Sequence, residues 1–193
     1  MKKLLFTLAV LLLSVGAQAQ EELTYGARFQ LGATMHSGDG ADNMDSSPSL
    51  TAAFVMDYRF ADNFSLLAEP GLALNYVQVT STTDKGFRTS DLGLNFFQVP
   101  IMLNYYPVES LGLNVKAGIQ PQYLLWLSNP DKHDFSKSDF KSFVMSVPVG
   151  VGYSFNSNLS VDVRYAFGIT PIYKIESYDL SQHTLTVGAS WMF

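Results

Sequence analysis

The chain has 193 residues, 47% of them hydrophobic and 15% charged, with a formal net charge of −5. This composition excludes a disordered chain, and the length favours a single domain. The absence of cysteine excludes disulfides, thiol nucleophiles, cysteine-ligated metals and a lipidated N-terminal cysteine. No basic run follows Lys2 and Lys3, so we expect no nucleic-acid partner.

The N-terminus has the pattern of a secretory signal peptide. Lys2 and Lys3 precede an apolar run at residues 4–13, and a small-residue cleavage site ends at Ala19. The run is too short for a transmembrane helix, which needs about 20 apolar residues. The sequence therefore predicts a signal peptide at residues 1–19 and an exported mature domain at residues 20–193.

Beyond the signal peptide, apolar and polar side chains alternate with a period of two, most clearly in residues 159–170. This period predicts β-strands with two chemically different faces. The short and long connectors between the predicted strands alternate, as in bacterial barrels whose short turns are periplasmic and whose long loops are extracellular. The predicted strands are residues 23–35, 49–60, 64–79, 92–106, 111–126, 143–155, 159–173 and 182–193.

The two faces of these predicted strands differ in charge. One face is apolar and suited to lipid, where a charge at mid-depth costs about 2–4 kcal/mol. The opposite face, the predicted interior, carries four basic and three acidic residues, which favours a nearly neutralised structural network over a proton or ion path. These residues are Arg28, Asp57, Arg59, Glu69, Lys116, Asp162 and Arg164.

Glycine distinguishes a barrel from a soluble sandwich. Nine strand glycines fall on the charged face, and none falls on the apolar face. A water-facing sheet surface has no need of missing side chains, but the lumen of an eight-stranded barrel is only just wide enough for side chains. We therefore predict an all-β fold, an eight-stranded antiparallel up-and-down transmembrane β-barrel in the cell outer membrane.

Two irregularities are expected in this wall. Proline lacks a ladder donor, so the prolines inside the predicted strands predict bulges. The apolar positions of residues 92–106 also change parity after Phe96, which predicts a local slip. The prolines concerned are Pro70, Pro100, Pro121, Pro148 and Pro171.

Two resemblances point to the same class of protein. Thr186, Gly188, Trp191 and Phe193 resemble the C-terminal signal of outer-membrane barrels, which implies the barrel insertion machinery as a partner. Residues 97–106 and 117–125, FQVPIMLNYY and AGIQPQYLL, resemble the PorT-like outer-membrane β-barrel family. That resemblance implies an outer-membrane barrel, without implying secretion, a transported substrate or catalytic residues.

No residue pattern predicts a catalytic, cofactor or metal site. The histidines lie in predicted loops or at a strand end, and Leu185 stands where the His-x-Ser pair of barrel deacylases would place serine. Three loop carboxylates lack the alternating ligand spacing of a calcium loop such as the EF-hand. These residues are His36, His133 and His183, and Asp39, Asp42 and Asp45.

The sequence therefore predicts a non-enzymatic, monomeric outer-membrane protein without a cofactor. Its expected partners are membrane lipid, the insertion machinery and an unidentified extracellular or envelope protein. Its expected role is structural support, surface interaction or adhesion through the extracellular loops. Two alternatives stay open at this point, namely a very narrow porin-like channel and a soluble periplasmic binding barrel.

Overall fold

A computed structural model describes residues 23–38, 44–83, 86–108, 111–128, 136–172 and 180–193. The predicted signal peptide lies outside these residues. No helix in the described part is long and apolar enough to cross a membrane. The strands are β1 (Leu23–Ser37), β2 (Met44–Asp45), β3 (Ser47–Ala61), β4 (Phe64–Ala68), β5 (Gly71–Thr83), β6 (Gly86–Gln98), β7 (Ile101–Tyr105), β8 (Leu113–Ser128), β9 (Phe143–Ser154), β10 (Leu159–Gly168) and β11 (Ser181–Met192), and a short 3-10 helix, η3, spans Lys137–Asp139.

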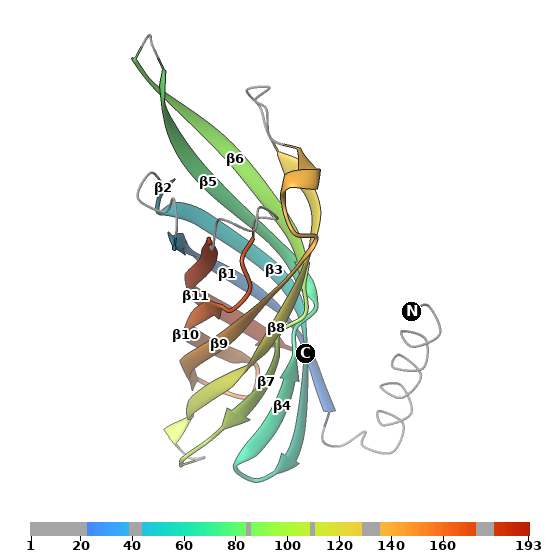
Figure 1. Cartoon of the computed structure of the whole chain (residues 1–193). Helices are drawn as coiled ribbons and strands as arrows, with labels where there is room; N and C mark the ends of the chain where they lie inside the picture. The colour runs from blue at the N-terminus through green and yellow to red at the C-terminus, as the bar shows by residue number, and fades with distance from the viewer. Residues whose placement is uncertain (1–22, 39–43, 84–85, 109–110, 129–135, 173–179) are drawn as a thin grey trace, which may run out of the picture.

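These strands form one closed sheet (Figure 1). Their order is β2-β5-β6-β8-β7-β4-β3-β1-β11-β10-β9, and β9 also pairs with β8, which closes the circle. Strands β4 and β5 are two parts of one wall strand, as are β6 and β7, and β2 is a two-residue addition beside β5. The predicted fold class, an eight-stranded antiparallel barrel, is therefore confirmed.

The prediction of β-bulges at the strand prolines is wrong. β4 and β5 are separated at Pro70, and β6 and β7 at Pro100, but the pairing register continues unchanged across both breaks. The proline carbonyls still accept backbone hydrogen bonds, so only one donor is lost at each break. Pro121 and Pro148 lie in regular register, and Pro171 follows the end of β10.

The irregularity predicted beside Phe96 is present, because the register with β8 shifts between Asn95 and Phe96, but β6 itself does not change parity. Leu92, Leu94 and Phe96 are at most 2% exposed and face the lumen, whereas Phe97 is 41% exposed and faces outward. Leu92, Leu94 and Phe96 therefore share the inward parity of the buried Gln98, and the apolar run marks a stretch where the interior itself is apolar. The one register shift beside β6 comes from β8, where Leu125 is an extra residue between the partners of Asn95 and Phe96.

The apolar interior residues form a cluster that we call the apolar plug. Connectors supply three of its members, because Phe140 follows η3 while Ile172 and Leu180 flank the β10–β11 connection. Backbone bonds from Lys141 to Ile172 and from Ile172 to Leu180 hold these segments inside the barrel. The plug consists of Ala73, Leu92, Leu94, Phe96, Leu124, Phe140, Val144, Ile172 and Leu180.

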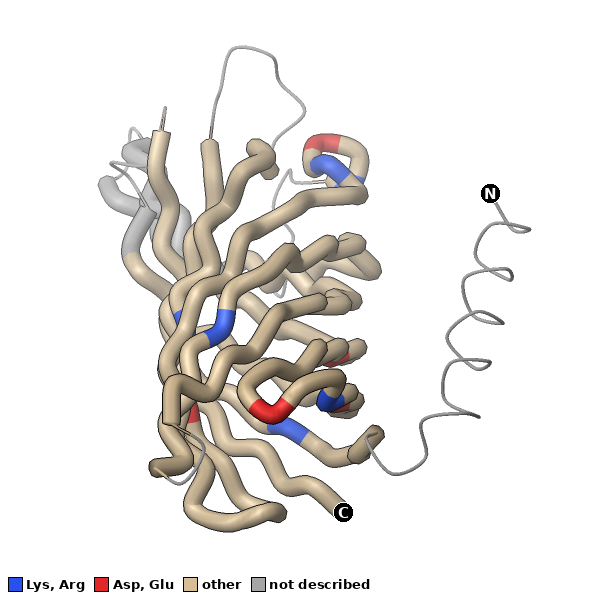
Figure 2. Tube along the Cα trace, turned by 90° about the horizontal axis from the view of Figure 1, so that it is seen from below, with Lys and Arg blue, Asp and Glu red and all other residues tan. Residues whose placement is uncertain are grey.

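The outer face of the wall is apolar, as predicted. Val151 and Val187 are 57% and 59% exposed, and charged positions are sparse along the strands (Figure 2). Near the short turns, Phe64 stacks between Phe60 and Tyr105, with ring centroids 6.2 and 4.8 Å apart. This arrangement suits a membrane wall with aromatic side chains at its interface.

Substitution of Gly188 tests how tightly the lumen is packed. A Cβ at Gly188 would lie 2.4 Å from Arg28 Nη2 and 2.8 Å from Gln30 Cγ. Gly188→Val should therefore lower stability by about 1–3 kcal/mol through overpacking. The neighbouring outward substitution Ala189→Val is the control and should leave the urea midpoint of the folded, heat-modifiable band unchanged. Equal midpoints for both variants would contradict a close-packed lumen.

Candidate functional site

Five of the seven predicted interior charges meet in the middle of the lumen. β-Strand alternation turns each side chain inward, and the strands bring them together from four parts of the wall. All five side chains are at most 6% exposed. We call this group the central network: Arg28 from β1, Glu69 between β4 and β5, Lys116 from β8, and Asp162 and Arg164 from β10.

Asp162 is the centre of this network because three cations share its carboxylate. Arg28 Nη2 donates to Asp162 Oδ1. Lys116 Nζ and Arg164 Nη2 both donate to Asp162 Oδ2, at 2.9 and 3.1 Å. One carboxylate therefore links three strands of the wall, β1, β8 and β10.

Glu69 is held mainly by Arg164. The two terminal nitrogens of Arg164 donate to the two oxygens of Glu69, with Nη2 2.8 Å from Oε1. This bidentate geometry is a strong form of charge-assisted hydrogen bond. Arg28 adds a weaker ion pair at 3.7 Å from Nε to Oε2 and donates from Nη1 to Ser190 Oγ at 2.7 Å.

The charges of the central network do not cancel. Arg28, Lys116 and Arg164 carry three positive charges, and Glu69 and Asp162 carry two negative ones. A buried network is stable only when each charge has partners. Substitution of a residue that is the main partner of another charge therefore costs the most stability. Arg164 is such a residue because Glu69 depends on it, whereas the loss of Lys116 leaves Asp162 with two arginine partners and Glu69 with its contacts unchanged.

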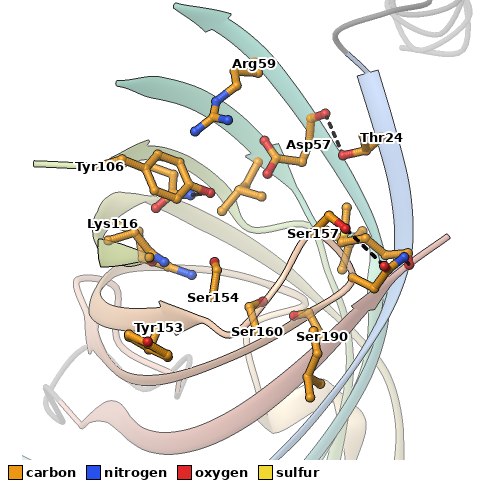
Figure 3. A pocket seen from close by; sticks show the side chains of 18 of the residues that line it. Thr24, Asp57, Arg59, Tyr106, Lys116, Tyr153, Ser154, Ser157, Ser160 and Ser190 are labelled. Carbon is orange, nitrogen blue, oxygen red and sulfur yellow. Dashed lines mark hydrogen bonds between the residues drawn. The ribbon is translucent and has the colours of Figure 1, made fainter. Parts of the chain in front are cut away.

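The other two predicted charges, Asp57 and Arg59, lie on the wall of a cavity of about 770 Å³. We call this cavity the vestibule. It extends from the central network to the turns at Asp62 and Ser157, the end of the barrel with short connectors. The guanidinium carbon of Arg59 lies 4.8 Å from the ring centroid of Tyr106, so a cation–π contact holds it at the wall (Figure 3).

Sequence reasoning missed the polar, uncharged residues of the vestibule. Tyr106 accepts from Asn104 Nδ2 at 2.8 Å through its hydroxyl. Ser160 of β10 stands beside Ser154 of β9 on one side and Ser190 of β11 on the other. We call these three residues the serine row. Their inward parity was visible in the sequence, but depth along the barrel depends on register, which a single sequence does not show.

Between the central network and the plug, polar side chains fill the lumen. Gln98 Oε1 accepts from Gln120 and Gln122 at 3.0 and 3.2 Å, and Ser146 donates to Gln122 at 3.2 Å. The cavity in this layer measures about 20 Å³, which is room for about one water molecule. In the described part of the chain, the vestibule therefore ends at the central network.

The C-terminal residues occupy two faces of β11. Thr186 and Gly188 are buried and face the lumen, whereas Trp191 and Phe193 are 53% and 76% exposed. At the opposite end of this strand, His183 Nε2 lies 2.7 Å from Ser37 Oγ.

The remaining candidates are the histidines and the loop carboxylates. Among the described residues, no group of three or more histidine, aspartate or glutamate side chains could hold a metal ion. Asp39, Asp42 and His133 lie outside the described residues.

The model of the outer membrane protein beta-barrel domain family matches residues 17–174. The chain belongs to this family. Membership in this outer-membrane barrel family agrees with the apolar outer face of the wall and with the sorting of charge into the lumen. A comparison with curated proteins finds no match.

Solved structures share the fold of this outer-membrane barrel. The attachment invasion locus protein Ail of Yersinia pestis is 13% identical, with a TM-score of 0.51 over 89% of this chain and 99% of that one. Neisserial surface protein A is 13% identical, with a TM-score of 0.48 over 88% and 97%. OprG of Pseudomonas aeruginosa is 15% identical, with a TM-score of 0.47 over 89% and 95%. At such identities, the likeness to Ail shows the fold alone.

Two substitutions within the central network should have opposite outcomes. Arg164→Met leaves Glu69 with the 3.7 Å contact to Arg28 as its remaining ion pair, so it should lower the free energy of unfolding by about 3 kcal/mol. Lys116→Met leaves Asp162 with two arginines and should leave this free energy unchanged or raise it. Urea unfolding of the refolded barrel in vesicles measures both. A larger loss for Lys116→Met would contradict this charge balance.

Proposed function

We propose that this outer-membrane barrel is a non-enzymatic protein that acts by contact at the cell surface. The hairpin formed by β5 and β6 carries the proposal. Its pairing runs from Gly71 and Gln98 to Thr83 and Gly86, whereas the neighbouring β8 stops pairing with β6 at Gly93. The hairpin thus continues for about 20 Å past the wall, at 3.3–3.4 Å per residue, and rises above the other strands (Figure 1).

This hairpin replaces a predicted loop. The sequence predicted a connector at residues 80–91, but the ladder continues to Thr83 and Gly86. Strand β2 adds a short third strand, with Met44 opposite Val79. A paired hairpin holds its shape outside the membrane at a smaller entropy cost on binding than a flexible loop of the same length. This favours surface interaction or adhesion over purely structural support.

The filled lumen supports contact over conduction. From the central network outward, an ion would meet buried ion pairs, a hydrogen-bonded glutamine layer and the apolar plug. We therefore rank the narrow channel second. Family membership supports a membrane-integrated barrel over a soluble periplasmic one.

The remaining parts of the proposal concern export and assembly. They are a cleaved signal peptide at residues 1–19, contact with membrane lipid, insertion through the C-terminal signal, and a monomeric state. We also propose a PorT-like barrel, because residues 97–106 and 117–125 resemble that family. The apolar outer face and the outward position of Trp191 and Phe193 are consistent with these steps.

Shortening the hairpin tests the proposal. Val77 and Leu92 stand directly opposite each other, so an Asn-Gly turn can replace residues 78–91 without changing register. The shortened chain should still insert and migrate as a heat-modifiable barrel, but cells displaying it should lose attachment to protein- and glycan-coated surfaces. Neither form should conduct ions in planar bilayers. Ion conductance together with unchanged attachment would contradict surface contact and favour the channel.

A further inference from the structure

The vestibule is a hollow created by small side chains. The serine row places three hydroxymethyl side chains side by side on β9, β10 and β11. Gly112 also lines the cavity and adds no side chain to it. The resulting volume of about 770 Å³ falls in the range of small-molecule pockets, roughly 300–1,000 Å³.

Polar and charged groups converge on this hollow. Figure 3 shows Arg59, Asp57, Tyr106 and Lys116 around the hollow, with Ser154, Ser160 and Ser190 below them in the view. Thr24, Asn104 and Asn114 also line it. Hydroxyl and amide groups can donate to or accept from a ligand in several orientations.

The floor of the vestibule has a positive excess. The central network contains three cations and two carboxylates, and Arg28, Lys116 and Arg164 all line the vestibule. Counted over all the charged residues that line the vestibule, the sum is one positive charge, because four cations stand against the three carboxylates of Asp57, Asp62 and Glu69. An ammonium has three donors, and among the described residues Lys116 Nζ makes a single hydrogen bond, to Asp162.

We propose that the vestibule is a binding pocket, open on the periplasmic side, for a small molecule that carries a phosphate or carboxylate group. Lys116 on the floor and Arg59 on the wall receive the anionic oxygens. The serine row binds the polar remainder of the molecule. The anion supplies the negative charge that the central network lacks, and the apolar plug leaves the periplasmic mouth as the route of entry. This role is independent of the surface hairpin.

Inorganic phosphate is the probe that tests this pocket. The refolded mature barrel in a non-ionic detergent is titrated with phosphate at constant ionic strength, with chloride as the balancing anion, while amide NMR shifts are recorded. Saturable shifts should be confined to vestibule residues such as Ser154, Ser160 and Ser190, with plug residues such as Leu124 unaffected. Acetate should produce the same pattern, and uncharged glycerol should not.

Two variants locate the bound anion. Lys116→Gln removes a cation from the floor but keeps the network balanced, and Ser160→Leu fills the hollow without changing any charge. Lys116→Gln should weaken phosphate binding by at least about tenfold, the effect of losing one charge-assisted contact, and Ser160→Leu should weaken it because the leucine occupies the space of the anion. Lys137→Gln, outside the lumen, is the control and should bind as the unmodified barrel does. Retained affinity in either lumen variant, or non-saturable shifts in the unmodified barrel, would overturn the proposal.

Discussion

The structure depends on burying charge inside a narrow barrel. A carboxylate within this lumen has little water, so Asp162 and Glu69 each need cations from neighbouring parts of the wall. Arg28, Lys116 and Arg164 come from strands that are distant in sequence, and they reach these carboxylates only in the closed barrel. The ion pairs of the central network therefore stabilise one register and one closure of the sheet over the alternatives.

The central network also divides the lumen into two unlike compartments. Toward the outer end, the glutamine layer and the apolar plug fill the interior, and plug residues such as Phe140 and Leu180 come from the connectors. Toward the short turns, small side chains leave the vestibule hollow. This division is compatible with both proposals, contact through the β5–β6 hairpin at one end of the barrel and ligand binding in the vestibule at the other.

The fold and the facing of its side chains could be predicted from the sequence, because lipid on one side and a narrow lumen on the other impose a strict period of two. Depth could not be predicted. Leu92 and Leu94 were misread since an apolar interior has the same residue types as an apolar exterior, and only the position of Phe140 and Ile172 explains it. Because depth is not visible in the sequence, the sequence also grouped Arg59 with the residues of the central network, although Arg59 lies on the wall of the vestibule.

A double-mutant cycle on Arg164 and Glu69 tests the central claim most directly. The free energies of unfolding of Arg164→Met, Glu69→Gln and the double variant are compared with those of the unmodified barrel in the same vesicles. If Arg164 and Glu69 are buried and each needs the other, the double variant should lose less free energy of unfolding than the two single variants together. The difference should be at least about 2 kcal/mol. Additivity within about 0.5 kcal/mol would show that the lumen charges are hydrated individually, and would contradict the account.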